Sequence, residues 1–242
     1  MAVKLKSVST NQTLRLAFKA VVTSLVLYWA KSHGFGFGTA LLFIVVFFAI
    51  YFRPALGNGR FAPSALTLFI LPFFILPVSG GADMLFIVSW GLSLFILLGV
   101  KNLVLIKRQS AYRVVHFGII AALGSLLMER PGLFSQAVMF VALLFVFREF
   151  YLTITSTDSE HSTLIAALEA FIFIELAWIL SFLSTDILAG GAFLALFALI
   201  FHDTTTHKLA GTLERQIIIR NGALFGILTL VILILSAKGA IM

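Results

Sequence analysis

Long apolar runs separated by short polar connections follow one another along the whole chain. Each run is about 17 to 25 residues long, the length that a helix needs to cross a hydrocarbon core of about 30 Å. Apolar and polar residues do not alternate at every second position, so helices are expected to satisfy the backbone inside the membrane. The pattern predicts an all-α, polytopic transmembrane helix bundle, a single integral membrane domain over residues 1–242. About nine spans are expected, roughly at 14–32, 35–52, 61–78, 83–101, 112–129, 132–150, 162–184, 186–201 and 220–237.

Basic residues lie almost entirely on one side of these spans. With the N-terminus inside, all 17 Lys and Arg residues fall on the inner side except Lys31, Arg130 and Lys238. Inner loops of membrane proteins carry such an excess. If one span were missing or additional, the basic residues after that point would fall on the opposite side and the bias would be lost. The bias therefore predicts an inside N-terminus and an outside C-terminus.

Composition supports a membrane protein and narrows its partners. The chain is 61% hydrophobic and 11% charged, whereas soluble domains carry about 25% charged residues. Its net charge of +7 is spread over loops and forms no continuous stripe, so we expect no nucleic-acid partner. The expected partner is instead the anionic headgroup layer at the inner face of a cell (cytoplasmic) membrane. The absence of cysteine excludes disulfides and thiolate metal sites.

Two carboxylates, Glu169 and Glu175, lie within the seventh predicted span. An ionisable residue deep in a spanning helix costs about 2.5 to 3.5 kcal/mol, so both need compensation. Counted from Ser162 at 1.5 Å per residue, they lie about 10 Å and about 20 Å deep, and six residues turn them about 120° apart. We expect Glu175 inside the bundle on the face of Trp178, as a protonatable group in a transport path or as a structural carboxyl group. Glu169 is expected to find water or a cation near the inner side.

Other residues could complete such a site. Lys19 in the first span or Lys101 at the end of the fourth could reach Glu169, unless both lysines snorkel to the headgroups. Pro72 should kink or break the third span, and Gly190-Gly191 should interrupt the short eighth span. Interrupted helices frame substrate sites in many transporters, although they also occur in proteins that transport nothing. The candidates for a buried polar or ligand-binding site are Glu175, Glu169, Trp178, Pro72 and Lys19.

The sequence predicts no catalytic residue, cofactor or metal. His202 and His207 are five residues apart, whereas a helical zinc-binding pair needs a spacing of four. We expect the inner histidines, including His116 and His161, to be solvated or to lie at headgroup level.

Local patterns predict three further features. Asp158 or Ser159 should cap the seventh helix. In the longest loop, 202–220, Leu209, Leu213 and Ile217 recur every four residues, which predicts a short amphipathic helix on the inner membrane surface. Gly222-x-x-x-Gly226 should be a close-packing position, within the monomer rather than between copies.

Three classes of function remain open. The leading hypothesis is a permease-like or ligand-handling membrane protein with a buried carboxylate in the bundle and a small-molecule or lipid ligand. The first alternative is a non-catalytic membrane subunit or scaffold, in which buried glutamates lock the helix packing. The second is a lipid-modifying enzyme that uses histidine and acidic residues at the inner face, although the sequence leans away from an enzyme.

The charge bias can be tested directly. Reporter fusions at the two ends of the chain should give a cytoplasmic signal at the N-terminus and an external signal at the C-terminus, because basic loops are retained inside. Signals from the same side at both ends would mean that the number of crossings is even and that the predicted topology is wrong.

Overall fold

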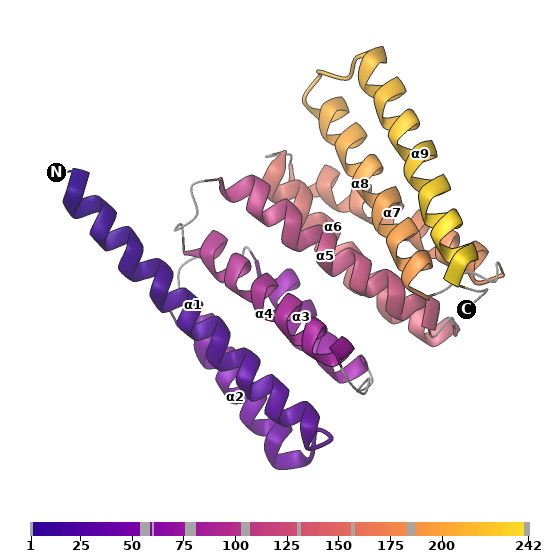
Figure 1. Ribbon diagram of the computed structural model, residues 1–242. Coiled ribbons are helices and arrows are strands. Elements are labelled where there is room, and N and C mark those ends of the chain that lie inside the picture. Colours follow the sequence, from indigo (N-terminus) through magenta and orange to yellow (C-terminus); the bar gives the residue numbers. More distant parts are fainter. Residues whose placement is uncertain are drawn as a thin grey trace. The chain divides into compact units, whose positions relative to one another are not determined.

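The structure is a computed structural model that describes residues 2–53, 59, 61–75, 81–102, 107–129, 132–155, 158–182 and 187–239. These described residues form nine helices and no strand (Figure 1). The helices are α1 (Ala2–Ser32), α2 (Phe37–Phe52), α3 (Ala62–Phe74), α4 (Gly81–Lys101), α5 (Arg108–Glu129), α6 (Leu133–Ile154), α7 (Ser159–Ser181), α8 (Ile187–Leu209) and α9 (Arg215–Gly239).

Seven of these helices are long and apolar enough to cross a membrane. Every helix lies on a predicted span, so the predicted all-α polytopic bundle is confirmed. The shorter helices are α2, with 16 residues, and α3, with 13 residues. At 1.5 Å per residue α3 reaches only about 20 Å, less than a hydrocarbon core of about 30 Å. Because α2 and α3 are consecutive, the orientation of later spans is the same whether this pair crosses the bilayer or only dips into it.

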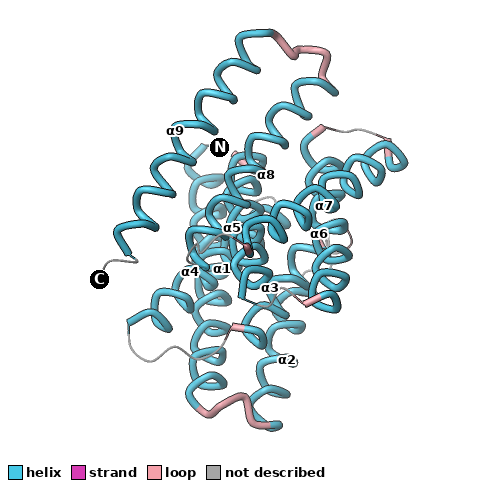
Figure 2. Tube along the Cα trace, turned by 90° about the vertical axis from the view of Figure 1, so that its right-hand side faces the viewer, coloured by secondary structure: helices cyan, strands magenta, loops and turns pink. Residues whose placement is uncertain are grey.

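The described helices pack into two compact units, Met1–Val115 and His116–Met242. In the first unit α1 packs against α2 and α4, and α3 packs against α4. In the second unit α6, α7, α8 and α9 pack in consecutive pairs. Figures 1 and 2 both show α1 with α2, and α8 with α9, as antiparallel hairpins. That the whole chain forms one integral domain stays a prediction.

A glycine in the left-handed region ends α8. Gly211 has φ of 67°, its N–H donates to Lys208 O over 3.1 Å, and Thr212 N–H donates to His207 O over 2.9 Å. This pair of bonds is a Schellman motif, which satisfies the last carbonyls of a helix. The same pattern ends α1 at Gly34, whose φ is 66°.

The predicted surface helix through Leu209, Leu213 and Ile217 is therefore wrong. Leu209 is the last residue of α8, and α9 already begins at Arg215. The period of four residues arose from two helices on either side of a turn.

The predicted N-cap of α7 is confirmed. Asp158 is the N-cap, and its Oδ1 accepts a 2.7 Å hydrogen bond from Ser159 N–H.

Pro72 lies inside α3, two residues before the helix ends at Phe74. Proline has no N–H, so it cannot donate to the carbonyl of Leu68 one turn earlier. The indole Nε1–H of Trp90, on α4, donates to this carbonyl instead over 2.7 Å in a buried position. A neighbouring helix thus satisfies the carbonyl that Pro72 leaves without a donor, as a lipid-embedded backbone requires.

Two lysines hold the C-terminal end of α2. Lys19 Nζ, on α1, donates to Arg53 O over 2.6 Å, and Lys101 Nζ, on α4, donates to Tyr51 O. The Lys101 ammonium also lies over the Tyr51 ring, 4.2 Å from its centroid. Only 2% of Lys101 is exposed, so the interpretation that it snorkels to the headgroups is wrong. Cations are favoured here because the carbonyls at a helix C-terminus carry partial negative charge.

The glycines of α8 serve packing. The helix is continuous through Gly190 and Gly191, so the predicted interruption is wrong. A Cβ at Gly191 would lie 2.1 Å from Ser125 Oγ and 2.9 Å from Ser125 N, so only glycine lets α8 approach α5 this closely. Gly222 and Gly226 differ, because a Cβ at either position would meet no described atom within 4 Å. The expected packing at these two glycines within the monomer is therefore absent from the described chain.

The link between Pro72 and Trp90 makes a testable prediction. Trp90→Phe should lower the free energy of unfolding, in part because it leaves the buried Leu68 carbonyl unpaired, a cost of about 1 to 3 kcal/mol. Pro72→Ala supplies a backbone N–H for the same carbonyl, so Trp90→Phe should cost less in that background. Unfolding in mixed micelles would measure all four proteins of this double-mutant cycle. If Trp90→Phe lowers the free energy of unfolding equally in both backgrounds, Trp90 does not compensate for the donor that Pro72 lacks.

Candidate functional site

The structure separates the five candidate residues. Pro72 and Lys19 belong to the first unit, where Pro72 is buried and Lys19 holds the end of α2. In the second unit Glu169 is fully buried, whereas Glu175 is exposed and Trp178 is 49% exposed. The expectation that Glu175 lies inside the bundle is therefore wrong. Whether any of the five contacts a ligand stays a prediction.

The helix α7 explains this separation. Its buried face carries small residues, including Ala166, Ala170 and Ala177, next to Glu169. Glu175 lies on the opposite side, among exposed large residues such as Trp178. It is six residues before the end of α7, about 9 Å at 1.5 Å per residue, so it is also closer to a helix end than expected.

Glu169 instead belongs to a buried chain of titratable side chains from four helices. Its Oε2 accepts a 2.8 Å hydrogen bond from the hydroxyl of Tyr151, on α6. Its Oε1 lies 2.7 Å from Nδ1 of His202, on α8. Nε2 of His202 lies 3.1 Å from Nε2 of His116, on α5. Thr205, one turn after His202, also makes a side-chain hydrogen bond to Tyr151. The chain Tyr151–Glu169–His202–His116 is at most 1% exposed at each member and is called the relay below.

Aromatic rings enclose the relay. The ring of His202 lies 4.1 Å from the Phe150 centroid and 5.2 Å from that of Phe147, edge to face in both cases. It stacks at 5.3 Å on Tyr151, and His116 stacks at 4.6 Å on Phe150. Phe147, Phe150 and Tyr151 follow at helical spacing on α6, so one face of this helix forms much of the wall. The enclosure keeps water away and strengthens electrostatic interactions inside.

His202 Nδ1 has two acceptors in reach. It lies 2.7 Å from the Ala198 carbonyl oxygen as well as 2.7 Å from Glu169 Oε1. A single N–H cannot point straight at both, and Glu169 Oε1 has no well-aligned hydrogen bond among the described groups. The proton can therefore reside on His202, facing an ionised Glu169, or on Glu169 itself. Both arrangements are neutral as a pair, which a buried site favours.

The relay can thus move a proton between Glu169 and His202 without placing a net charge in the interior. On the other side of His202, the two Nε2 atoms must share one proton, because one nitrogen donates and the other accepts. A proton gained at one end changes the donor and acceptor roles along the whole chain. Proton transfer between these groups is the chemistry that this arrangement supports.

The predicted pairing of Glu169 with Lys19 is replaced within the second unit by Tyr151 and His202. The acidic residue next to His202 takes no part in the relay. Asp203 Oδ2 accepts a 2.7 Å ion-paired bond from Arg220 and a 3.0 Å bond from Asn221 Nδ2, both on α9. Among the described residues no group of three or more His, Cys, Asp or Glu side chains is placed to hold a metal ion.

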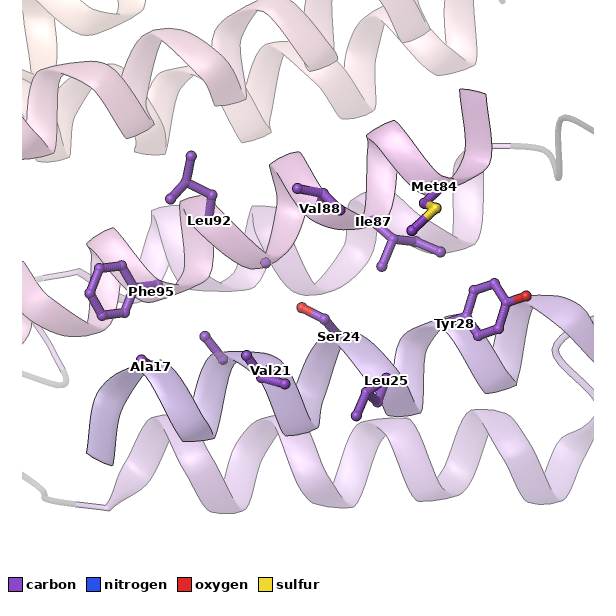
Figure 3. Close-up of a pocket in the computed structure, with 12 residues that line it drawn as sticks. Ala17, Val21, Ser24, Leu25, Tyr28, Met84, Ile87, Val88, Leu92 and Phe95 are labelled. Atoms are coloured by element: carbon purple, nitrogen blue, oxygen red, sulfur yellow. The ribbon is translucent and has the colours of Figure 1, made fainter. Parts of the chain in front are cut away.

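A second feature, in the first unit, is an apolar groove between α1 and α4. It has a volume of about 580 Å³, and none of the five predicted residues lines it. Figure 3 shows Tyr28 and Met84 at one end, Ala17 and Phe95 at the other, and the Ser24 hydroxyl pointing toward α4 between them. A Cβ at Gly91 would lie 2.2 Å from Ser24 Oγ, so the two helices touch at the floor. The lining suits a hydrocarbon chain of the surrounding bilayer.

Sequence reasoning missed Tyr151, and its expectation that His116 and His202 are solvated or lie at headgroup level is wrong, because both are buried and in contact. His202 was placed in a loop because the eighth span was expected to end at residue 201, whereas α8 runs on to Leu209. A helix continued by two turns would have placed His202 at a depth similar to that of His116, counted from the same side. The buried Glu149 on α6 was also missed.

The relay predicts an asymmetry between two substitutions at Glu169. Glu169→Leu should lower the free energy of unfolding by about 3 kcal/mol, because it leaves the buried Tyr151 hydroxyl and His202 without their acceptor. Tyr151→Phe should then cost less in the Glu169→Leu background than in the wild type, by the logic of a double-mutant cycle. Glu169→Gln keeps an acceptor for Tyr151, so it should lower the free energy of unfolding less than Glu169→Leu does. Strict additivity, measured by unfolding in mixed micelles, would argue against the bond between Tyr151 and Glu169.

Comparison of the chain with known protein families, with curated proteins and with solved structures finds no match. The geometry of its own residues therefore carries the functional inference.

Proposed function

We propose that this multi-pass helical protein is a permease-like protein of the cytoplasmic membrane that couples the handling of a small ligand to protonation of the relay. The observation that carries the proposal is the fully buried Glu169 within 2.7 Å of His202. Ionisable groups inside a membrane bundle are expensive to bury and mark ion and proton pathways in pumps and transporters. In this proposal Glu169 and His202 hold the proton, and Tyr151 and His116 orient the two groups.

Helix geometry supports a role in coupling. The four relay residues come from α5, α6, α7 and α8, so any change in proton position acts on four helices at once. A ligand that prefers one arrangement of these helices would shift the proton, and by linkage the proton would shift the ligand affinity. Histidine is suited to this task because each of its two ring nitrogens can donate or accept a proton.

A second candidate is the non-catalytic scaffold, in which the same groups only lock the helices together. The observation that favours it is the close aromatic enclosure of His202 by Phe147 and Phe150. A scaffold needs the hydrogen bonds but no proton movement. The two functions therefore differ in their response to Glu169→Gln, which keeps size and hydrogen bonding but cannot titrate.

Proteoliposomes with a trapped pH-sensitive dye would test the proposal. Proton movement, driven by a membrane potential and measured with a panel of small neutral, cationic and anionic metabolites, should appear with the wild type. Glu169→Gln and His202→Gln should each abolish it while the protein stays folded, because the relay then loses a titratable member. Glu160→Gln is the matched control, since Glu160 is an exposed carboxylate in the first turn of the same helix.

The outcomes separate the two candidates. Loss of proton movement in the two relay variants, with retention in Glu160→Gln, supports the permease. No proton movement with the wild type, or equal movement in the wild type and Glu169→Gln, contradicts the permease and leaves the scaffold.

A further inference from the structure

Charge is divided very unevenly between the two units. Of the ten Asp and Glu residues, Asp83 is the only one in the first unit, which holds all the Lys and Arg residues up to Arg113. Asp83 is in the first turn of α4, whereas Lys101 is the last residue of that helix. Eighteen residues at 1.5 Å per residue separate them by about 27 Å. No acidic residue of the first unit therefore lies near the Lys101 end of α4.

Cations from three helices meet at that end. Lys19 from α1 and Lys101 from α4 donate to carbonyls only two residues apart at the end of α2, Tyr51 O and Arg53 O. Arg15, one turn before Lys19, and Arg53 both act on Lys19 by like-charge repulsion, and Lys19 acts in the same way on Lys101. We name these four residues, Arg15, Lys19, Arg53 and Lys101, the basic cluster.

Within the described part of the first unit, no carboxylate pairs with the basic cluster. Two neutral carbonyls and the face of Tyr51 take up part of the charge of the two lysines. Like charges brought together away from water are unfavourable, and an uncompensated buried ammonium is more so. The exposed guanidinium groups of Arg15 and Arg53 leave the cluster open to an anion from outside the chain.

We propose that the basic cluster binds the phosphate of an anionic phospholipid. Arginine is suited to phosphate because its planar fork donates two parallel hydrogen bonds. A lipid is the favoured source because the cluster lies within the first two to three turns of the membrane-spanning part of α1, Asn11–Ser32, and at the last residue of α4, on the side that the charge pattern places inside, where anionic headgroups are concentrated. Arg15 and Arg53 contact the phosphate, while Lys19 and Lys101 set the positive potential behind it and fix the end of α2.

Native mass spectrometry of the purified full-length protein in a neutral detergent would test this site. Phosphatidylglycerol should bind in preference to phosphatidylcholine. Arg15→Gln combined with Arg53→Gln should weaken phosphatidylglycerol binding about 30-fold, since each basic residue contributes about 1 kcal/mol to contact with anionic lipid. The double variant Arg15→Lys with Arg53→Lys keeps both positive charges, so its affinity for phosphatidylglycerol should fall less than that of the double Gln variant. Both positions are exposed, so the variants should fold.

The matched control removes the same charge elsewhere. Lys208 and Arg215 are exposed basic residues in the second unit, at the turn between α8 and α9. Lys208→Gln with Arg215→Gln should change phosphatidylglycerol binding less than threefold, an effect below about 0.7 kcal/mol. An equal loss in both double variants, or no preference of the wild type for phosphatidylglycerol, would overturn the site. Inorganic phosphate that stabilises the protein as much as phosphatidylglycerol would instead show a site for free phosphate and overturn the lipid assignment.

Discussion

The helix packing of the second unit depends on one contact, the 2.7 Å approach of His202 Nδ1 to Glu169 Oε1. A carboxylate removed from water needs a donor or a proton within reach, and here α6 and α8 each provide one group for it. Ala166 and Ala170, which flank Glu169 on the buried face of α7, leave room for these groups to approach. On α8, Gly191 likewise allows a close approach to α5, the helix that carries His116. The close packing of the helices in this unit therefore brings the polar side chains of the relay into hydrogen-bonding distance.

In the first unit the buried side-chain donors serve a different purpose, which is to form hydrogen bonds with backbone carbonyls. Pro72 leaves the Leu68 carbonyl without a donor inside the bundle, and Trp90 supplies one from α4. The end of α2 exposes further carbonyls, which Lys19 and Lys101 bind from α1 and α4. Buried carbonyls need such donors, so α4 acts as a hydrogen-bonding support for both short helices, through Trp90 for α3 and Lys101 for α2. This role explains why Trp90 and Lys101 are buried on α4.

Hydrophobic run length predicted the helices well, because the demand for an apolar stretch of bilayer length acts on the sequence alone. The cap at Asp158 followed from local chemistry in the same way. Side-chain orientation was harder to predict. Glu169 and Glu175 lie on the same helix and differ only in the direction in which they point, and this direction depends on which helices pack nearby. The relay was hidden for a related reason. Its members are separated by up to 86 residues, and His202 was assigned to a loop because the Schellman turn at Gly211 comes two turns later than expected.

The last helix contributes little buried surface. Only 6% of the spanning part of α9 is buried, and its main described partner is α8, to which Asn221 and Arg220 bind through Asp203. All four relay residues precede α9 in the chain. The hydrogen bonds and aromatic contacts of the relay therefore need only helices α5 to α8, and α9 adds the Asp203 contacts on the outside of α8.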